Sequence, residues 1–288
     1  MESPVIAPLA ALLYPAILWC GVRISPLFVA VSLVVPVLGV LAVARLAHAP
    51  RARAIALLVV AAPPLFSLLG GWLDFQHAIP IGSLGVWIPL WSALAVVAAT
   101  ERTPRRSCAL PAPRRLALAH GASASVIVLF ALPHLANHLA GLIGGDTHVA
   151  VMAALRHVYR HPAVEPVLLA AVAFQVGSGA WLLRRALARC AGWPATLQVA
   201  SGSYLVFFLL SHASAALRAR ARGGDPNWYW LAGGELLHDP WSVRLVPYYF
   251  LAVIALGVHV GCALRRLPIV AFAAGLVSTL IVIGLFRA

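Results

Sequence analysis

Long apolar segments recur along the whole chain, and they predict that it folds as an integral membrane protein. Each segment holds about 17–23 residues with few charged side chains, the length that crosses a bilayer as a helix. The segments are continuous rather than alternating, which disfavours transmembrane β-strands. We expect an all-α, polytopic membrane helix bundle of about nine transmembrane helices. The segments are approximately 5–22, 27–47, 54–71, 80–99, 118–140, 163–186, 193–217, 243–264 and 267–287.

The composition supports this class and excludes others. The 288 residues are 62% hydrophobic and only 10% charged, whereas soluble domains have about 25% charged residues. The net charge of +13 comes from arginines in short clusters between the apolar segments, where such residues act as topology signals. We therefore expect the lipid bilayer as a partner and no binding of nucleic acid.

The loops of the predicted bundle alternate in charge. Arginines cluster at 45–53, 101–116, 184–189 and 265–266, and most acidic residues lie in the loops between these clusters. By the positive-inside rule, the arginine-rich side faces the cytoplasm. We expect a multi-pass protein of a bacterial inner membrane with its N-terminus in the cytoplasm.

A segment rich in proline and arginine divides the chain into two regions. Residues 1–100 are predicted to form an N-terminal four-helix membrane region that is poor in histidine. Residues 118–288 are predicted to form a five-helix membrane region that carries nearly all the candidate functional side chains. The intervening residues 101–117 are interpreted as a cytoplasmic linker.

Histidines inside two of the later segments form the candidate site. His134 and His138 are four residues apart, so a helix places them on one face beside Asn137. His212, near the outer end of its own segment, has a depth similar to that of His134. Polar side chains at membrane depth are costly and often functional, and two facing neutral imidazoles suit a b-type haem. We expect one haem b whose iron is held by His134 and His212.

Side chains around this pair complete the expected site. His138 is an alternative ligand, and His138 and Asn137 are also placed to contact a quinone at the haem edge. The long outer loops 141–162 and 218–242 carry arginines that can pair with the haem propionates through charge-assisted hydrogen bonds. These arginines are Arg156, Arg160 and Arg218.

His259 lies closer to the cytoplasmic end of its segment than His212 does. As the ligand of a second haem it needs a partner, and the candidates are Gln175 and His120. The alternative is that His259 is a core histidine. The four cysteines show no CxxC spacing, which gives no support to a covalently attached haem or a cysteine zinc site.

The histidines of the outer loop 141–162 leave a further interpretation open. His157 and His161 are again four residues apart, and with His134, His138 and His148 they could build a membrane metal site. Dense HxxHH clusters are missing and carboxylates are few. The alternative is that the three loop histidines are solvated.

The later segments also carry a longer pattern. Gln198-x-x-Ser-Gly-x-Tyr-Leu-x-x-Phe-x-x-x-His212 precedes a segment with His259-x-Gly-x-x-x-Arg, and Glu165-Pro166 opens a segment containing Gly-Ser-Gly-Ala-Trp. On these residues, the region from about 118 to 266 resembles the membrane-anchor cytochrome b of succinate dehydrogenases and fumarate reductases.

The resemblance implies the ligand set. In two-haem members of that family the first, second, fourth and fifth helices each supply a histidine. Here His134 or His138 takes the first place, His212 the fourth and His259 the fifth, but Gln175 takes the second, which favours one haem. A fungal mitochondrial adaptor family with a histidine-bearing membrane domain is a more distant resemblance, and it implies a structural haem.

We therefore interpret the chain as an integral membrane b-type cytochrome. One haem is expected between the fifth and seventh segments, in quinone-linked electron transfer with a redox partner protein. The alternatives are a transporter or lipid-handling membrane protein with structural histidines, or a metal-dependent membrane enzyme with histidine ligands.

Overall fold

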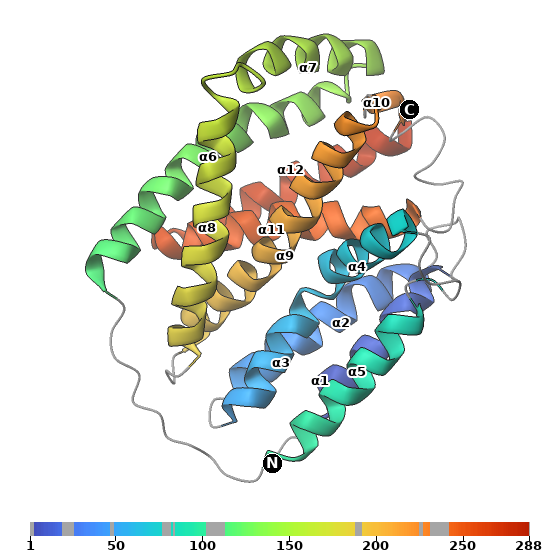
Figure 1. Cartoon of the computed structure of the whole chain (residues 1–288), viewed down its shortest axis with the longest axis vertical. Coiled ribbons are helices and arrows are strands. Elements are labelled where there is room, and N and C mark those ends of the chain that lie inside the picture. The colour runs from blue at the N-terminus through green and yellow to red at the C-terminus, as the bar shows by residue number, and fades with distance from the viewer. Residues whose placement is uncertain are drawn as a thin grey trace.

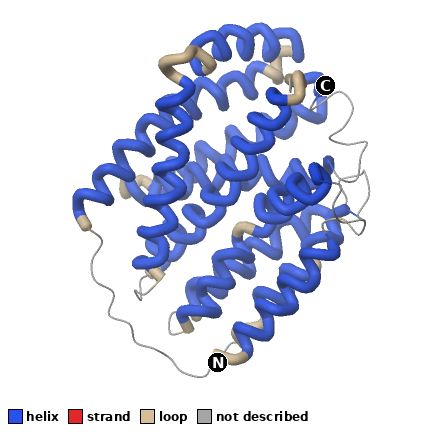
Figure 2. Tube along the Cα trace, in the orientation of Figure 1, coloured by secondary structure: helices blue, strands red, loops and turns tan. Residues whose placement is uncertain are grey.

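The computed structural model forms helices and no strands in the residues that it describes (Figures 1 and 2). The all-α prediction is therefore confirmed for that part of the chain. The described residues are 3–18, 26–46, 49–76, 82, 84–101, 113–187, 192–224, 227–230 and 242–287.

The elements follow one another along the chain with short connections. Those before the predicted linker are α1 (Ile6–Leu12), η1 (Tyr14–Leu18), α2 (Pro26–Arg45), α3 (Pro50–Val60), α4 (Ala62–Gln76) and α5 (Leu84–Ala99). Those after it are α6 (Arg114–Ala140), α7 (Gly145–Tyr159), α8 (Glu165–Ala186), α9 (Trp193–Ala221), α10 (Trp228–Trp230), η3 (Ser242–Arg244), α11 (Leu245–Ala263) and α12 (Leu267–Arg287).

Six of the described helices are long and apolar enough to cross a membrane, namely α2, α6, α8, α9, α11 and α12. A seventh crossing is added if α3 and α4 form one broken span, since they meet near Ala61 with a bend of 72°. Pro63 and Pro64 lack the amide protons that would continue the hydrogen bonds of α3, which explains the break. The apolar helices α1 and α5 are shorter. The chain is thus a multi-pass helix bundle, and the expected nine crossings are not confirmed.

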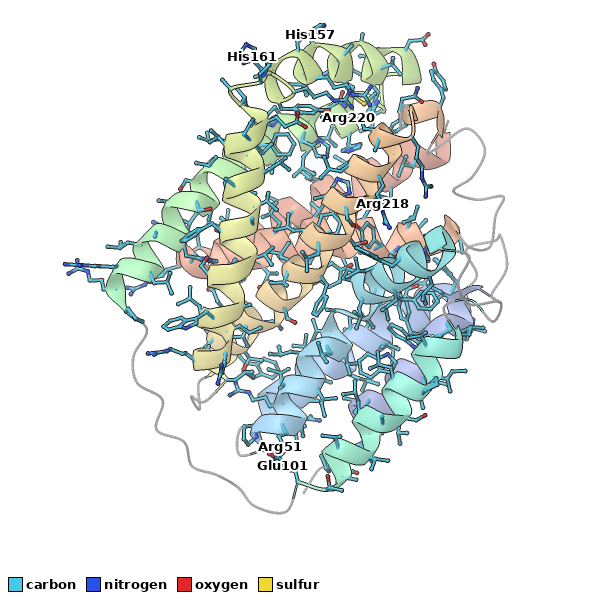
Figure 3. All side chains as sticks on the ribbon, in the orientation of Figure 1. Arg51, Glu101, His157, His161, Arg218 and Arg220 are labelled. Carbon is cyan, nitrogen blue, oxygen red and sulfur yellow. The ribbon has the colours of Figure 1, made fainter. Side chains whose placement is uncertain are left out.

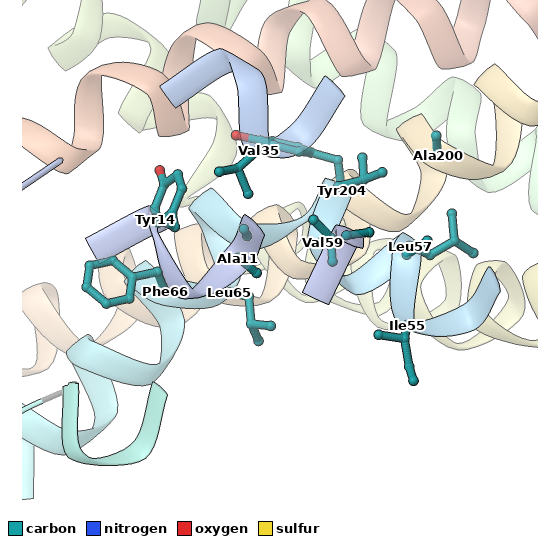
Figure 4. Close-up of a cluster of buried hydrophobic side chains, with 14 of the residues drawn as sticks. Ala11, Tyr14, Val35, Ile55, Leu57, Val59, Leu65, Phe66, Ala200 and Tyr204 are labelled. Atoms are coloured by element: carbon teal, nitrogen blue, oxygen red, sulfur yellow. The ribbon is translucent and has the colours of Figure 1, made fainter. Parts of the chain in front are cut away.

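Helix α9 joins the two halves of the chain. It contacts α2, α3 and α4 as well as α8 and α11. Figure 4 shows the shared core, in which Tyr204 of α9 belongs to the same cluster as Tyr14 and Phe66. The Ser203 hydroxyl also donates a hydrogen bond of 3.0 Å to the Leu57 carbonyl of α3. The early helices therefore complete their burial against a later helix.

A buried arginine holds together the ends of two helices. Arg53 is only 2% exposed. Its guanidinium donates hydrogen bonds of 3.0 Å to the carbonyl of Val43, in the last turn of α2, and to the carbonyl of Leu187, at the end of α8. Helix C-termini have unpaired carbonyls and a partial negative charge, so a cation is favourable there.

A carboxylate plays the complementary role at a helix N-terminus. Glu101, which follows α5, accepts hydrogen bonds from the amides of Arg51 and Ala52 in the first turn of α3, at 3.1 and 2.8 Å. Figure 3 shows Arg51 beside Glu101 at the lower end of the molecule, opposite His157 and His161 at the upper end. Residues of the two predicted loop classes therefore lie at opposite ends.

The outer segment 141–162 is not a simple loop, and the prediction is corrected there. Helix α7 fills most of it and lies across the upper end of the molecule against α6 (Figure 1). Asp146 in its first turn and Arg156 in its last turn carry charges that interact favourably with the dipole of α7. In the second long loop α9 continues to Ala221. Residues 225–226 and 231–241 of that loop, and 102–112 of the linker, lie outside the described residues.

Candidate functional site

A large cavity lies among the later helices. Its volume is about 1260 Å³, and α6, α8, α9, α11 and α12 supply most of its mainly apolar wall. Ligand pockets usually have about 300–1,000 Å³, so this cavity can hold a large cofactor or lipid-like molecule. Six histidines line it: His120, His134, His138, His148, His212 and His259.

The imidazoles of His134 of α6 and His212 of α9 lie close together in the wall of this cavity. Their ring centroids are 6.1 Å apart and their planes differ by 64°. A metal-bound imidazole nitrogen lies about 2 Å from its metal, as in zinc sites, with the ring centroid roughly 1 Å further away. Two imidazoles bound to one metal therefore have ring centroids at most about 6 Å apart. Among the described residues neither imidazole has a hydrogen-bond partner, so both side chains could bind one metal group in the cavity.

Each of these imidazoles is stacked on a phenylalanine one helical turn earlier. Phe130 lies 5.4 Å from His134 with planes 20° apart, and Phe208 lies 5.2 Å from His212 with planes 9° apart. Residues four apart share a helix face, so the repeated Phe-x-x-x-His spacing orients both rings. The spacing is visible in the sequence, where Phe130 precedes His134 as Phe208 precedes His212.

A second group of polar side chains continues from this pair toward α7. The His138 ring lies 4.8 Å from His134 and 5.3 Å from His148. The Asn137 amide nitrogen lies 3.1 Å from Nε2 of His148, and Asn137 and His148 are each 2% exposed. The expectation of a solvated His148 is therefore wrong. Burial lowers the pKa of His148, and the positive charge of Arg156 lowers it further.

The other histidines of this outer segment lie elsewhere. His157 and His161 are exposed at the upper surface (Figure 3), and Nδ1 of His161 accepts a hydrogen bond from the Ala163 amide. Within the described part of the chain no three His, Cys, Asp or Glu side chains are placed to hold one metal ion. The geometry therefore gives no support to the metal-enzyme alternative.

The three predicted propionate partners, Arg156, Arg160 and Arg218, all line the cavity. Arg218 is already engaged, because it donates hydrogen bonds of 3.0 Å to the Gly71 carbonyl and 3.2 Å to the Ser214 carbonyl. Arg156 and Arg160, at the end of α7, are half-buried. These two guanidinium groups also supply positive charge at the wall of the cavity.

His259 lies among polar side chains near the start of α9. Its Nδ1 donates a hydrogen bond of 3.1 Å to the Gln198 carbonyl, and a Cβ on Gly202 would lie 3.0 Å from its ring. Gly202 therefore makes room for the His259 ring.

His120, the possible partner of His259, is held in a similar way. Its Nδ1 lies 2.8 Å from Ser178 Oγ, and the Gln175 amide nitrogen lies 2.9 Å from its Nε2. Both nitrogens of His120 are thus occupied by protein groups. A second haem with this ligand would have to displace Gln175.

Two contributors to the site were missed at the sequence level. The Trp228 ring packs 4.8 Å from that of His148, and Tyr249 lies 5.9 Å from His212. Both come from segments far away in the chain, and no local signal placed them here.

Comparison with known proteins gave no match to a family model, a curated protein or a solved structure. The resemblance of residues 118–266 to membrane-anchor cytochromes b therefore stays a prediction. Function must be inferred from the cavity and its side chains.

Proposed function

We propose that this protein is an integral membrane b-type cytochrome in which His134 of α6 and His212 of α9 would hold the iron of one haem. The observation that carries the proposal is the proximity of these two imidazoles in the wall of a large cavity, at a centroid separation of 6.1 Å. Because polar side chains in a membrane are costly, two imidazoles without a described protein partner favour a bound metal group.

The residues of the chain have distinct tasks in this proposal. Phe130 and Phe208 fix the orientation of the two imidazoles by stacking on them. The apolar wall excludes water from the cavity, and Arg156 and Arg160 supply positive charge for the propionates. The haem supplies reversible one-electron chemistry, which no side chain of the protein provides.

We also propose the electron-transfer partners of the haem. A membrane-soluble quinone is the proposed substrate, with His138 and Asn137 near the haem edge. A redox partner protein exchanges electrons with the haem. We further propose that the protein lies in a bacterial inner membrane with its N-terminus in the cytoplasm, and that α1 and α5 belong to two of nine crossings.

The size and apolar wall of the cavity favour a second candidate, which is a carrier for a lipid-like molecule with structural histidines. A volume of about 1260 Å³ exceeds that of most small-molecule pockets. This candidate predicts a colourless protein that co-purifies with lipid.

A reduced-minus-oxidised visible spectrum of the detergent-purified protein tests the proposal. We expect a b-type spectrum with one haem per chain, lost in His134→Ala and in His212→Ala. The exposed His157 provides the matched control, since His157→Ala should keep the spectrum. Glycine variants of the two ligands should regain it when imidazole is added. A colourless wild-type protein of normal yield would overturn the haem proposal and favour the carrier.

A further inference from the structure

A group of charged and polar side chains lies at the upper end of the molecule, where α7 ends, α8 begins and α9 ends. Arg220, in the last turn of α9, donates hydrogen bonds of 2.5 and 3.3 Å to the two carboxylate oxygens of Glu165, the first residue of α8. Tyr159 is the last residue of α7 and interacts electrostatically with the Arg220 guanidinium, and Arg160 follows it directly. Figure 3 shows Arg220 beneath α7. We call these four residues the basic corner.

The basic corner has hydrogen-bond donors left over for a ligand. A guanidinium has five N–H groups, so the two bonds to Glu165 leave three of those of Arg220. The Arg220 side chain is 45% exposed, which makes these groups accessible. Among the described residues, neither the Arg160 guanidinium nor the Tyr159 hydroxyl has a hydrogen-bond partner. With one carboxylate against two guanidinium groups, the corner has a net positive charge of one.

The basic corner also borders apolar surface. All four of its residues line the mainly apolar cavity. Glu165 opens one candidate membrane span, and Arg220 lies in the last turn of another. Exposed apolar side chains of α7, α8 and α9 flank the corner, namely Val158, Val167 and Leu217. The corner is therefore placed at the level of lipid headgroups, beside apolar surface that suits acyl chains.

We propose that the basic corner binds the headgroup of an anionic phospholipid, whose phosphate accepts hydrogen bonds from Arg160, Arg220 and Tyr159. A phosphodiester carries one negative charge, which matches the net charge of the corner. Arginine suits this ligand because its planar guanidinium can donate two parallel hydrogen bonds to a phosphate. Basic pockets between membrane helices are known to bind acidic lipid headgroups. The acyl chains lie against the exposed apolar side chains that flank the corner.

A haem propionate is a second source of negative charge in the cavity, and the proposed function assigns Arg160 to it. The lipid site does not rest on that assignment, because Arg220 and Tyr159 have no part in the proposed haem site. Glu165 offers a further distinction, since its carboxylate competes with a bound anion for the Arg220 guanidinium. Removing each partner of this ion pair should therefore change lipid binding in opposite directions.

Binding of phosphatidylglycerol to the detergent-purified full-length protein, measured by native mass spectrometry, tests the site. Phosphatidylcholine with the same acyl chains is the reference lipid, because its choline makes the headgroup neutral. We expect the wild type to prefer phosphatidylglycerol by at least roughly threefold. Arg220→Gln and Tyr159→Phe each remove a donor to the phosphate and should weaken phosphatidylglycerol binding roughly threefold to tenfold. Arg51→Gln, with an exposed side chain at the opposite end, is the control and should have no effect.

Glu165→Gln separates lipid binding from a structural role of the ion pair. We expect this variant to bind phosphatidylglycerol roughly twofold to fivefold more tightly, because Arg220 is released and a negative charge is removed. A purely structural ion pair would make Glu165→Gln and Arg220→Gln behave alike. Weaker binding in both variants, or no change in either, therefore overturns the lipid site, as does equal binding of the two lipids by the wild type.

Haem content, measured in the same samples, distinguishes the two anions. If Arg160→Gln lowers the haem content and leaves phosphatidylglycerol binding unchanged, the corner serves a haem propionate and the lipid site is refuted. A colourless protein that binds phosphatidylglycerol selectively refutes only the proposed cytochrome.

Discussion

At the scale of single residues, burial of charge is the most consequential feature of this chain. Arg53 sits inside the bundle because two helix ends present unpaired carbonyl oxygens to it, at Val43 and Leu187. A buried cation without such partners would be strongly destabilising. Its neighbour Arg51 has an exposed side chain and contributes only its backbone amide to the contact with Glu101.

These two arginines make a matched pair for mutation. We expect Arg53→Gln to lower the free energy of unfolding by about 2–3 kcal/mol, because hydrogen bonds from a charged donor to two carbonyls are lost. Arg51→Gln should change it by less than about 0.5 kcal/mol. Thermal unfolding in detergent, followed by circular dichroism, measures both variants. Equal midpoints for the two would contradict a structural role for Arg53.

The sequence was informative about residues whose role depends on their own helix. His134, His138 and His212 were assigned to one site from spacing and depth, and the structure brings their rings together. The sequence failed for His148, which was interpreted as a solvated loop residue. The burial of His148 depends on α7 folding back across α6 and on Trp228 covering it, and both are tertiary events without a local signal.

At the scale of elements, close packing of α11 on α12 depends on two glycines one turn apart. A Cβ on Gly257 would overlap the Ala274 side chain, and a Cβ on Gly261 would lie 3.0 Å from the Leu267 backbone. Small residues spaced by four let membrane helices approach closely. By contrast, Gly275 of α12 has open space where its Cβ would be.

This contrast predicts opposite effects for the same substitution. Gly257→Ala should lower the free energy of unfolding by about 1–3 kcal/mol, because α11 and α12 must separate. Gly275→Ala should raise it by about 0.5–1 kcal/mol, because alanine is the better helix former. Unfolding in detergent with increasing denaturant measures both. Two changes of the same sign would argue against the observed α11–α12 contact.

The positions of the helices were predicted better in the later part of the chain than in the segment 54–71. The segments that became α6, α8, α9, α11 and α12 were placed correctly, since each is a long uninterrupted apolar run. The run 54–71 became two helices, and its paired prolines at 63 and 64 are the reason. Hydropathy averages over such a break, so a single span was expected where the chain bends.

At the scale of the whole molecule, the two ends of the bundle carry residues from different predicted loops. Figure 3 places Arg51 and Glu101 at one end and His157 and His161 at the other. A bilayer around the apolar middle would put these two ends in different compartments. The arrangement agrees with the alternation of loops expected from the arginine clusters.

Cysteine labelling from one side of the membrane tests this sidedness. In a variant without the four native cysteines, Arg51→Cys and His157→Cys should react from opposite sides with a membrane-impermeant maleimide. In inside-out vesicles we expect labelling at position 51, and in intact cells at position 157. Labelling of both positions from the same side would refute the arrangement, and reversed labelling would refute only the proposed orientation.

The hydrogen bond between Leu57 and Ser203 has a consequence for the time course of biosynthesis. Its partners are 146 residues apart in the chain, and ribosomes add about 5–20 residues per second. Helix α3 therefore waits roughly 7–30 s in the membrane before α9 emerges to cover it. During that interval the nascent first half exposes a surface that a membrane chaperone or a protease can recognise.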